Sequence, residues 1–390
     1  MASAEGGDRG EVFGTDRCLF VTRSVAIIGT RGYPSYYGGF ETAVRRIAPY
    51  LAESGWDVTV YGRPGSTKAD DVDRDPRVIS RETRGIESKS LSTLTYGLSS
   101  CLDAARRKPD VALVMNVANG FWLPALKARG IPSLVNVDGI EWDRAKWGRA
   151  AKAMFRAGAK MTALTADQLL FDAEAIGARW RRDFHRDGVF VPYGGDVPPT
   201  LPVQEGLTHR GYVLVVARFV PENSIGEFLS AAVLLSERWP VVIVGSTGYG
   251  GEFDVRAKSL SDENANIQWL GHVSDDRRLL SLWQHCGVYF HGHSVGGTNP
   301  ALVQAMACGI PIVARDTIYN REVLSDKAVF TSPDPLSIAR NIDRLMSDRE
   351  LQSSLAAAVQ ERASTDYSWN SVCERYEEAL LKLIGETVSA

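Results

Sequence analysis

The pattern of apolar and polar positions divides the chain into two similar halves. Short apolar runs rich in Val and Ile alternate with stretches of helical periodicity, which is typical of buried parallel strands joined by helices. The first series of apolar runs lies at residues 25–29, 58–61, 111–115 and 134–137. The second lies at residues 212–216, 241–244, 267–270, 288–290 and 312–314. The pattern predicts an α/β fold with two doubly wound, Rossmann-like domains that face a cleft.

A segment that fits neither periodicity separates the two series. PPTLPVQEGLTH, which starts at Pro198, contains prolines and polar residues that are typical of a linker. We therefore expect an N-terminal domain over 24–198, a linker over 199–209 and a second domain over 210–367. Residues 1–23 are Gly-rich and polar, and they predict a disordered tail.

Composition narrows the choice of partners and compartment. The net charge of -3 argues against a general nucleic-acid binder, although residues 24–200 carry about +5 and residues 201–390 about -7. The five cysteines are odd in number and show no C-x-x-C spacing, so neither a disulfide framework nor a zinc site is indicated. No run of eighteen apolar residues occurs, and acidic residues interrupt the first 23 positions. We expect a cytoplasmic protein.

A glycine pair follows the first predicted strand. The strand VAIIG leads into TRGYPSYYGGFET, and helical spacing then continues until Gly55. Gly38 and Gly39 have no Cβ and allow a ligand to approach the backbone, while the helix start offers N–H groups to a phosphate. Taken alone, the pair favours a tight turn that binds nothing.

A second glycine-containing loop follows a strand of the second domain. In HGHSVGGTNPALVQAMACG, the residues Gly296, Gly297, Thr298 and Asn299 precede Pro300, and Asn299 is the expected N-cap. Such a loop suits a diphosphate. A capped core helix explains the helix but leaves the histidines and glycines before it unexplained. His291 and His293 could bind a metal, but no third ligand has usable spacing, so a hydrogen-bonding role for His293 is favoured.

One arginine completes the candidate anion site. Arg218 ends the strand YVLVVAR, and the carboxyl end of such a strand points into the ligand crevice. Its guanidinium could pair with phosphate oxygens. Taken alone, Arg218 would be expected to form a surface salt bridge.

The order of these motifs from Val25 to Ile384 resembles glycosyltransferase family 4, whose members have the GT-B fold. VPYGGD is similar to the segment that closes the first domain, and YSWNSVCERYEEALLKLI resembles the helix that crosses back, expected over 368–388. Four longer matches resemble the bacterial rhamnosyltransferase-like subgroup: GTRGYPSYYGGFET, VNVDGIEWDRAKW, ARFVPEN and HGHSVGGTNP. The resemblance implies transfer of a sugar from a nucleotide diphosphate donor with retention, and L-rhamnose is a frequent sugar in the resembled subgroup. It also implies a glycan, lipid-linked or small-molecule acceptor.

The chain departs from the family pattern at several donor positions. Asn223 stands where the wider family has a lysine, and Gly296 and Gln304 stand where it has paired glutamates. Gln304 can still donate and accept a hydrogen bond to the donor ribose. Asp138 replaces a common histidine and could orient an acceptor hydroxyl or the donor sugar. The acceptor side is expected to include Asp138 together with Tyr37, Asn116 and Glu141.

The implied mechanism is electrostatic. Arg218 and the amides from Gly297 to Asn299 would stabilise negative charge on the leaving diphosphate. No cofactor or metal is expected, because Asp71 and Asp73, which have Asp-x-Asp spacing, lie in a polar stretch typical of a solvated loop. Two alternatives remain at this point. One is a nucleotide-sugar epimerase of similar architecture; the other is a catalytically weak partner protein, suggested by Asn223 and Gln304.

One segment suggests a membrane surface. WDRAKWGRAAKAMFRAGAK, from Trp142, interleaves basic residues with Trp142, Trp147 and Phe155. A basic helix with exposed aromatics suits the anionic inner face of a membrane, where the protein would bind peripherally. The alternative is an ordinary surface helix whose aromatics pack inward.

Overall fold

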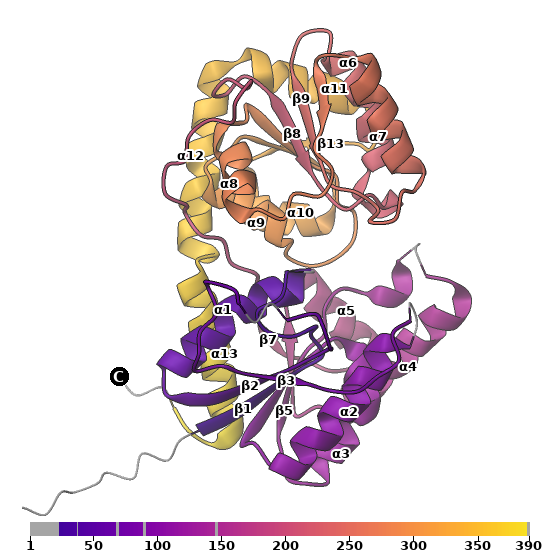
Figure 1. Cartoon of the computed structure of the whole chain (residues 1–390), viewed down its shortest axis with the longest axis vertical. Coiled ribbons are helices and arrows are strands. Elements are labelled where there is room, and N and C mark those ends of the chain that lie inside the picture. Colours follow the sequence, from indigo (N-terminus) through magenta and orange to yellow (C-terminus); the bar gives the residue numbers. More distant parts are fainter. Residues whose placement is uncertain (1–22, 37, 68–69, 89–90, 145–146, 388–390) are drawn as a thin grey trace, which may run out of the picture.

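The computed structural model describes residues 23–36, 38–67, 70–88, 91–144 and 147–387. The chain forms two α/β domains that follow one another along its longest axis (Figure 1). The first domain has a seven-stranded sheet of order β3-β2-β1-β4-β5-β6-β7, and the second a six-stranded sheet of order β10-β9-β8-β11-β12-β13. All paired strands in both sheets are parallel. The predicted pair of Rossmann-like domains is confirmed.

The first domain alternates strands and helices. Its strands are β1 Arg23–Ile28, β2 Trp56–Gly62, β3 Ile79–Glu82, β4 Val111–Met115, β5 Ser133–Asn136, β6 Gln168–Phe171 and β7 Val189–Phe190. Its α-helices are α1 Gly39–Glu53, α2 Ser92–Arg107, α3 Leu123–Lys127, α4 Arg149–Thr165 and α5 Glu174–Phe184. Two 3-10 helices are η1 Val117–Trp122 and η2 Glu141–Asp143.

The second domain repeats the alternation. Its strands are β8 Val213–Val216, β9 Val241–Val244, β10 Ile267–Trp269, β11 Val288–His291, β12 Ile312–Arg315 and β13 Val329–Thr331. Its helices are η3 Pro221–Asn223, α6 Ile225–Leu235, α7 Glu252–Glu263, α8 Asp276–His285, α9 Pro300–Ala307, α10 Ile318–Leu324, α11 Pro335–Ser347 and α12 Arg349–Asp366. The last helix, α13 Trp369–Ile384, returns to the first domain.

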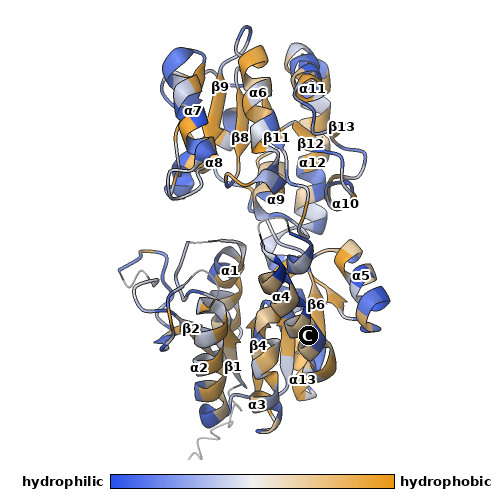
Figure 2. Cartoon of the chain, turned by 90° about the vertical axis from the view of Figure 1, so that its right-hand side faces the viewer, coloured by the Kyte–Doolittle hydropathy of each residue, from blue (hydrophilic) through white to orange (hydrophobic). Residues whose placement is uncertain are grey.

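Helices cover both faces of each sheet, so the central strands are apolar along their whole length (Figure 2). Every residue of β4 and β9 is buried. This continuous burial explains why the sequence located the central strands. The sequence missed β3, β6, β7 and β13, which are short or lie at or next to a sheet edge. In β3, ISRE, no residue is buried, and the apolar signal is correspondingly weak.

Helix α13 packs into the core of the first domain. Its Val372, Tyr376 and Leu380 belong to the same buried cluster as Ile47 and Leu51 of α1. Glu377 accepts a hydrogen bond of 2.9 Å from the Trp56 indole of β2. The C-terminal helix therefore contributes core side chains to a sheet that begins more than three hundred residues earlier.

The chain passes between the domains at two glycines. A Cβ on Gly194 would lie 2.6 Å from the Trp369 ring, and one on Gly195 would lie 2.8 Å from the carbonyl oxygen of Val303. The Gly195 N–H also donates to the Tyr367 carbonyl at 2.8 Å. Side chains at these positions would separate the crossing segments, so close backbone approach requires glycine here.

Candidate active site

The loops that follow the strands of the two sheets meet at the domain boundary. Both sheets reverse their strand order beside the first strand, between β1 and β4 and between β8 and β11. Ligands of doubly wound sheets bind outside the carboxyl ends of the strands at this switch point. A Cβ on Gly39, after β1, would lie 3.5 Å from Pro300, and one on Gly139, after β5, would lie 3.2 Å from the Gly296 Cα. The candidate residues of both domains therefore gather in one place.

The glycine pair of the first domain lies at the N-terminus of α1, as the sequence indicates. Gly38 is the N-cap of α1 and offers no side-chain cap. A Cβ on Gly39 would also lie 3.2 Å from the hydroxyl of Tyr193, so the backbone here is enclosed by the neighbouring segment. The predicted acceptor-side residue Tyr37 lies outside the described residues.

The loop before α9 is fastened to the first domain. The N–H of Thr298 donates to the Asp172 carbonyl at 3.1 Å, and the Thr298 hydroxyl donates to the same oxygen. A Cβ on Gly297 would overlap the Asp172 carboxyl, with only 2.0 Å to its Oδ1. Asp172 follows β6, so this contact joins the two sheets directly.

Asn299 caps α9, as predicted. Its side chain accepts a hydrogen bond of 3.0 Å from the Ala301 N–H, and its carbonyl accepts bonds from Leu302 and Val303. Pro300 has no N–H. The first-turn amides of α9 are therefore used within the helix, and an anion at this end would meet the helix dipole and the backbone of Gly296 and Gly297 instead.

Arg218 and Asn223 lie in the loop after β8. The Arg218 side chain is exposed. Asn223 is only 4% exposed, and its Nδ2 donates to the Arg218 carbonyl at 3.0 Å. Asn223, which stands at the lysine position of the wider family, therefore closes the loop with its amide. Arg218 is then the cation that this loop presents.

His291, the last residue of β11, and His293, which follows the strand, stack on each other, with ring centroids 4.3 Å apart. His291 is hydrogen-bonded through Nδ1 to the Tyr289 hydroxyl at 3.1 Å. Among the described residues, Nδ1 of His293 has no hydrogen-bond partner. Burial, together with the charges of Arg218 and Arg144, lowers the pKa of His293 to about 3. The ring is therefore neutral at physiological pH, which suits hydrogen bonding to a substrate and excludes a cationic role in this state.

Asp138 has a left-handed backbone with φ 60°. Its N–H donates to the Asn136 side chain at 3.0 Å, which holds this conformation. Its carboxylate lies close enough to Asp172 and Tyr193 that its charge contributes to raising the pKa of both, after burial as the first cause. The structure thus brings Asp138 to the boundary, beside Gly139 and the loop of Gly296.

Asn116 and Glu141, the other residues predicted on the acceptor side, bind to neighbouring groups of the first domain. The Asn116 side chain accepts from the Ala118 N–H at 2.9 Å and caps η1. Glu141 is buried; it accepts a hydrogen bond from the Trp147 indole at 2.7 Å and forms an ion pair of 2.5 Å with Nε of Arg144. Glu141 is therefore placed to orient Arg144.

Gln304, the predicted ribose ligand, bonds to the segment that leaves the first domain. Its Nε2 donates to the Asp196 carbonyl at 2.8 Å, and its Oε1 accepts from the Asp196 N–H at 3.3 Å. Both ends of the amide are thus used to join the domains.

Sequence reasoning missed Asp172 and Arg144. Asp172 is 3% exposed, and its Oδ1 has no hydrogen-bond partner among the described residues. Burial, and then Asp138, raises its pKa well above the usual range. The available signal was positional, because Asp172 directly follows β6, a strand that the apolar pattern did not reveal. Arg144 lies inside the motif VNVDGIEWDRAKW, but the sequence placed it only among the basic residues of the membrane-facing segment, not in the donor site.

The basic segment from Trp142 differs from its prediction. It is not one helix, since η2 ends at Asp143 and α4 begins at Arg149. Trp142 and Phe155 are buried, and Trp147 packs on Phe155 with ring centroids 5.3 Å apart. The aromatics pack inward because they complete the core beneath α4. The outward face of α4 still carries exposed basic residues, namely Arg149, Arg156 and Lys160. Lys146 lies outside the described residues.

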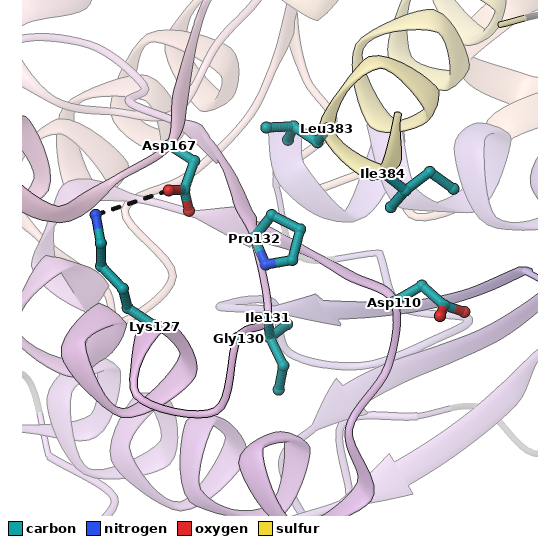
Figure 3. Close-up of a pocket in the computed structure, with 8 residues that line it drawn as sticks. All are labelled: Asp110, Lys127, Gly130, Ile131, Pro132, Asp167, Leu383 and Ile384. Atoms are coloured by element: carbon teal, nitrogen blue, oxygen red, sulfur yellow. Dashed lines mark ion pairs between the residues drawn. The ribbon is translucent and has the colours of Figure 1, made fainter. Parts of the chain in front are cut away.

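A hollow of about 520 Å³ lies at the end of the first sheet that is opposite the domain boundary, where the strands begin (Figure 3). It is lined by residues that precede β4, β5 and β6 and by the end of α13, and it contains the ion pair between Lys127 and Asp167 at 3.7 Å. Because these residues lie at the amino ends of the strands, the hollow is separate from the loops that meet at the domain boundary. No helix in the described part of the chain is long and apolar enough to cross a membrane.

Two family models match the chain in the order of its domains. "Glycosyl transferase 4-like domain" matches residues 38–194, and "Glycosyl transferases group 1" matches residues 200–362. Together with the two parallel sheets, these matches define the class of protein as a glycosyltransferase of the GT-B type. The N-terminal half of the chain is therefore similar to the 4-like domain, and the C-terminal half to the group 1 domain.

Sequence relatives match over part of their length. The chain is 28% identical over 225 residues to phosphatidyl-myo-inositol mannosyltransferase of Mycolicibacterium smegmatis, covering 55% of this chain and 56% of the relative. It is 26% identical over 168 residues to N,N'-diacetylbacillosaminyl-diphospho-undecaprenol alpha-1,3-N-acetylgalactosaminyltransferase of Campylobacter jejuni, covering 42% of this chain and 43% of the relative. The matches thus span about half of these relatives or less.

Solved structures share the fold over nearly the whole chain. Sucrose-phosphate synthase from Thermosynechococcus elongatus superimposes with a TM-score of 0.75 at 18% identity, covering 93% of this chain and 99% of that one. Anabaena HepE in complex with UDP gives a TM-score of 0.69 at 17% identity, covering 93% and 100%. Membership of the rhamnosyltransferase-like subgroup remains a prediction, because the family models and relatives described above do not distinguish that subgroup.

Proposed function

We propose that the protein transfers a sugar from a nucleotide diphosphate donor to a hydroxyl of a glycan, lipid-linked or small-molecule acceptor. The observation that carries this proposal is the meeting of Arg218 and the loop Gly296–Asn299 with the first-domain residues Gly39, Asp138 and Asp172 at one boundary. A guanidinium, a helix dipole and glycine backbone on one side suit a diphosphate. A carboxylate opposite them suits a hydroxyl that must be oriented.

The residues support an electrostatic mechanism. Arg218 would stabilise negative charge as it develops on the leaving diphosphate, and the N-terminal end of α9 would add its dipole. Neutral His293 would hydrogen-bond the donor, and Asp138 would orient the sugar or the incoming hydroxyl. The proposal invokes no metal ion. In line with the family resemblance, we propose that the sugar is L-rhamnose and that the anomeric configuration is retained.

The decisive experiment follows release of nucleoside diphosphate from UDP-, GDP- and dTDP-sugars, including dTDP-L-rhamnose, with and without polyprenyl-linked and simple glycoside acceptors. Acceptor-dependent release from one donor is expected, and NMR of the product then gives the anomeric configuration. Interconversion of the donor sugar without transfer would indicate an epimerase. Donor binding without release from any pair would favour a binding protein, and either result would overturn the proposal.

A lipid-linked acceptor would be reached most simply at a membrane surface. The names of the two sequence relatives above refer to a phosphatidylinositol and a diphospho-undecaprenol substrate. Since Trp142 and Phe155 are buried, we propose that the outward cations of α4 attract anionic lipid without insertion of aromatic anchors. Each such residue near the surface contributes roughly 1 kcal/mol, and salt weakens the attraction.

The membrane proposal is tested by sedimentation with phosphatidylglycerol vesicles and with neutral phosphatidylcholine vesicles. Salt-sensitive binding to the anionic vesicles is expected, and it should be lost when Arg149, Arg156 and Lys160 are changed to glutamate. The matched control makes the same change at three exposed cations of the second domain, namely Arg238, Lys258 and Arg321. Equal sedimentation of the two triple variants would contradict a role for α4.

A further inference from the structure

Arg144 belongs to the first domain but lies against a loop of the second. A Cβ on Gly296 would lie 3.9 Å from its Nη2, and a Cβ on Gly139 would lie 3.0 Å from the same atom. Only 14% of the Arg144 side chain is exposed. The guanidinium is therefore enclosed between the Asp138–Gly139 turn and the glycine loop that precedes α9.

The Glu141 carboxylate lies behind Arg144 and pairs with it. Its Nε forms the 2.5 Å ion pair with Oε1 of Glu141, and the other carboxylate oxygen of Glu141 accepts the Trp147 indole N–H. Burial alone would lower the pKa of Arg144, but Glu141, Asp138, Glu222 and Asp172 together raise it, so the side chain is charged. A charged fork with its Nη2 edge toward Gly296 is suited to a phosphate group.

Two arginines from different domains act on the same imidazole. The charges of Arg218 and Arg144 both lower the pKa of His293, after burial as the larger cause. Arg218 reaches this point from the loop after β8, and Arg144 reaches it from the loop after β5. The loop of Arg218 provides no second cation, because Asn223 is buried and its amide bonds to the Arg218 carbonyl.

We infer that Arg144 binds the donor diphosphate together with Arg218 and supplies, from the first domain, the second positive charge of the site. The inference rests on the proposed function and names a further residue of its binding machinery. Because the two arginines belong to different domains, a diphosphate held by both would also hold the domains together. Glu141 is then a positioning residue that acts through Arg144.

The test measures binding of UDP, GDP and dTDP to the full chain by calorimetry at low salt, with the matching monophosphates for comparison. For the diphosphate that wild type binds, Arg144→Gln is expected to weaken affinity about tenfold or more, in the range of a charge-assisted hydrogen bond. The loss should be larger for the diphosphate than for the monophosphate. Arg106→Gln removes an exposed charge near the C-terminal end of α2 and should bind as wild type does.

A glutamine at position 144 leaves Glu141 buried without its partner, which could unfold the variant. The double variant Glu141→Gln/Arg144→Gln removes both charges, and Glu141→Gln alone is its reference. The double variant should still bind the diphosphate about tenfold more weakly than wild type, with the single Glu141 variant between them.

The outcomes separate the inference from the proposed function. If Arg218→Gln loses affinity but Arg144→Gln, or the double variant, binds the diphosphate as wild type does, Arg144 has no role and the proposed function stands. If wild type binds none of the three diphosphates, both the proposed function and the inference about Arg144 are wrong. An equal loss for diphosphate and monophosphate in the Arg144 variants would also overturn the inference, since it would indicate a general disturbance of the site.

Discussion

The carbonyl oxygen of Asp172 accepts two hydrogen bonds from Thr298, one from its N–H at 3.1 Å and one from its hydroxyl. The two residues are 126 positions apart and belong to different domains. The Asp172 carboxyl lies directly over Gly297, where any side chain would collide with it. The loop that is proposed to bind the diphosphate is thus fastened to the first domain by both the N–H and the hydroxyl of Thr298.

We predict that Asp172→Asn stabilises the protein increasingly as pH rises. Burial, followed by the charge of Asp138, raises the pKa of Asp172 well above its ordinary value of 3.8. The folded protein therefore retains a proton that the unfolded chain releases above about pH 3.8, so wild-type stability falls as pH rises through the folded-state pKa. Asparagine has a similar shape and does not ionise. Denaturant unfolding at pH 5 and pH 8 measures the difference.

The free energy of unfolding of Asp172→Asn should exceed that of wild type by more at pH 8 than at pH 5. Glu322, Arg144 and Asp138 also face this carboxyl, but they are present in both proteins and largely cancel in the comparison. A difference that is constant with pH would mean that Asp172 is already ionised in the folded protein.

Gln304→Glu is predicted to destabilise the junction of the domains. The glutamine Nε2 donates to the Asp196 carbonyl at 2.8 Å. A glutamate would instead place a carboxylate oxygen against that carbonyl, so the hydrogen bond would be replaced by repulsion. A loss of about 1–3 kcal/mol in the free energy of unfolding is expected from chemical denaturation. The isosteric change keeps volume constant, and an unchanged or higher stability would show that the side chain is free to turn toward a ribose.

The features that depend only on neighbouring residues, namely the central strands and the helix cap at Asn299, could be predicted from the sequence. Continuous runs of Val and Ile located the central strands because those strands are buried on both faces. Asn299 was predictable as an N-cap because the cap is a local arrangement of an amide side chain before Pro300.

What depends on distant contacts could not be predicted. The roles of Asp172 and Arg144 arise only when residues more than a hundred positions apart meet at the domain boundary. The inward direction of Trp142 and Phe155 depends on the core beneath α4, which the interleaving of basic and aromatic residues does not reveal. Asn223 is different, because its contact is local: its amide donates to the carbonyl of Arg218, five residues earlier in the same loop.

The His293 imidazole is predicted to stay neutral in the ligand-free protein well below pH 6.5. Burial and the two arginine charges lower its pKa to about 3. Ring nitrogen chemical shifts, followed from about pH 8 to about pH 5, should show no titration of this residue, whereas the exposed reference value for histidine is about 6.5. Protonation of His293 near pH 6.5 would mean that the ring is hydrated and the arginines are turned away.

Arg218→Ala is predicted to abolish measurable transfer and leave the fold intact. The side chain is exposed, so its removal leaves no buried charge or cavity, and the thermal unfolding midpoint should stay within a few degrees of wild type. A charge-assisted bond to a diphosphate contributes roughly 1.5–3 kcal/mol, which corresponds to about a 10- to 150-fold loss of nucleoside diphosphate affinity. Arg238→Ala, which removes an exposed arginine paired with Asp343, is the matched control and should bind as wild type does. If calorimetry shows unchanged diphosphate affinity for the Arg218 variant, the guanidinium does not contact the diphosphate, and the glycine loops must account for binding.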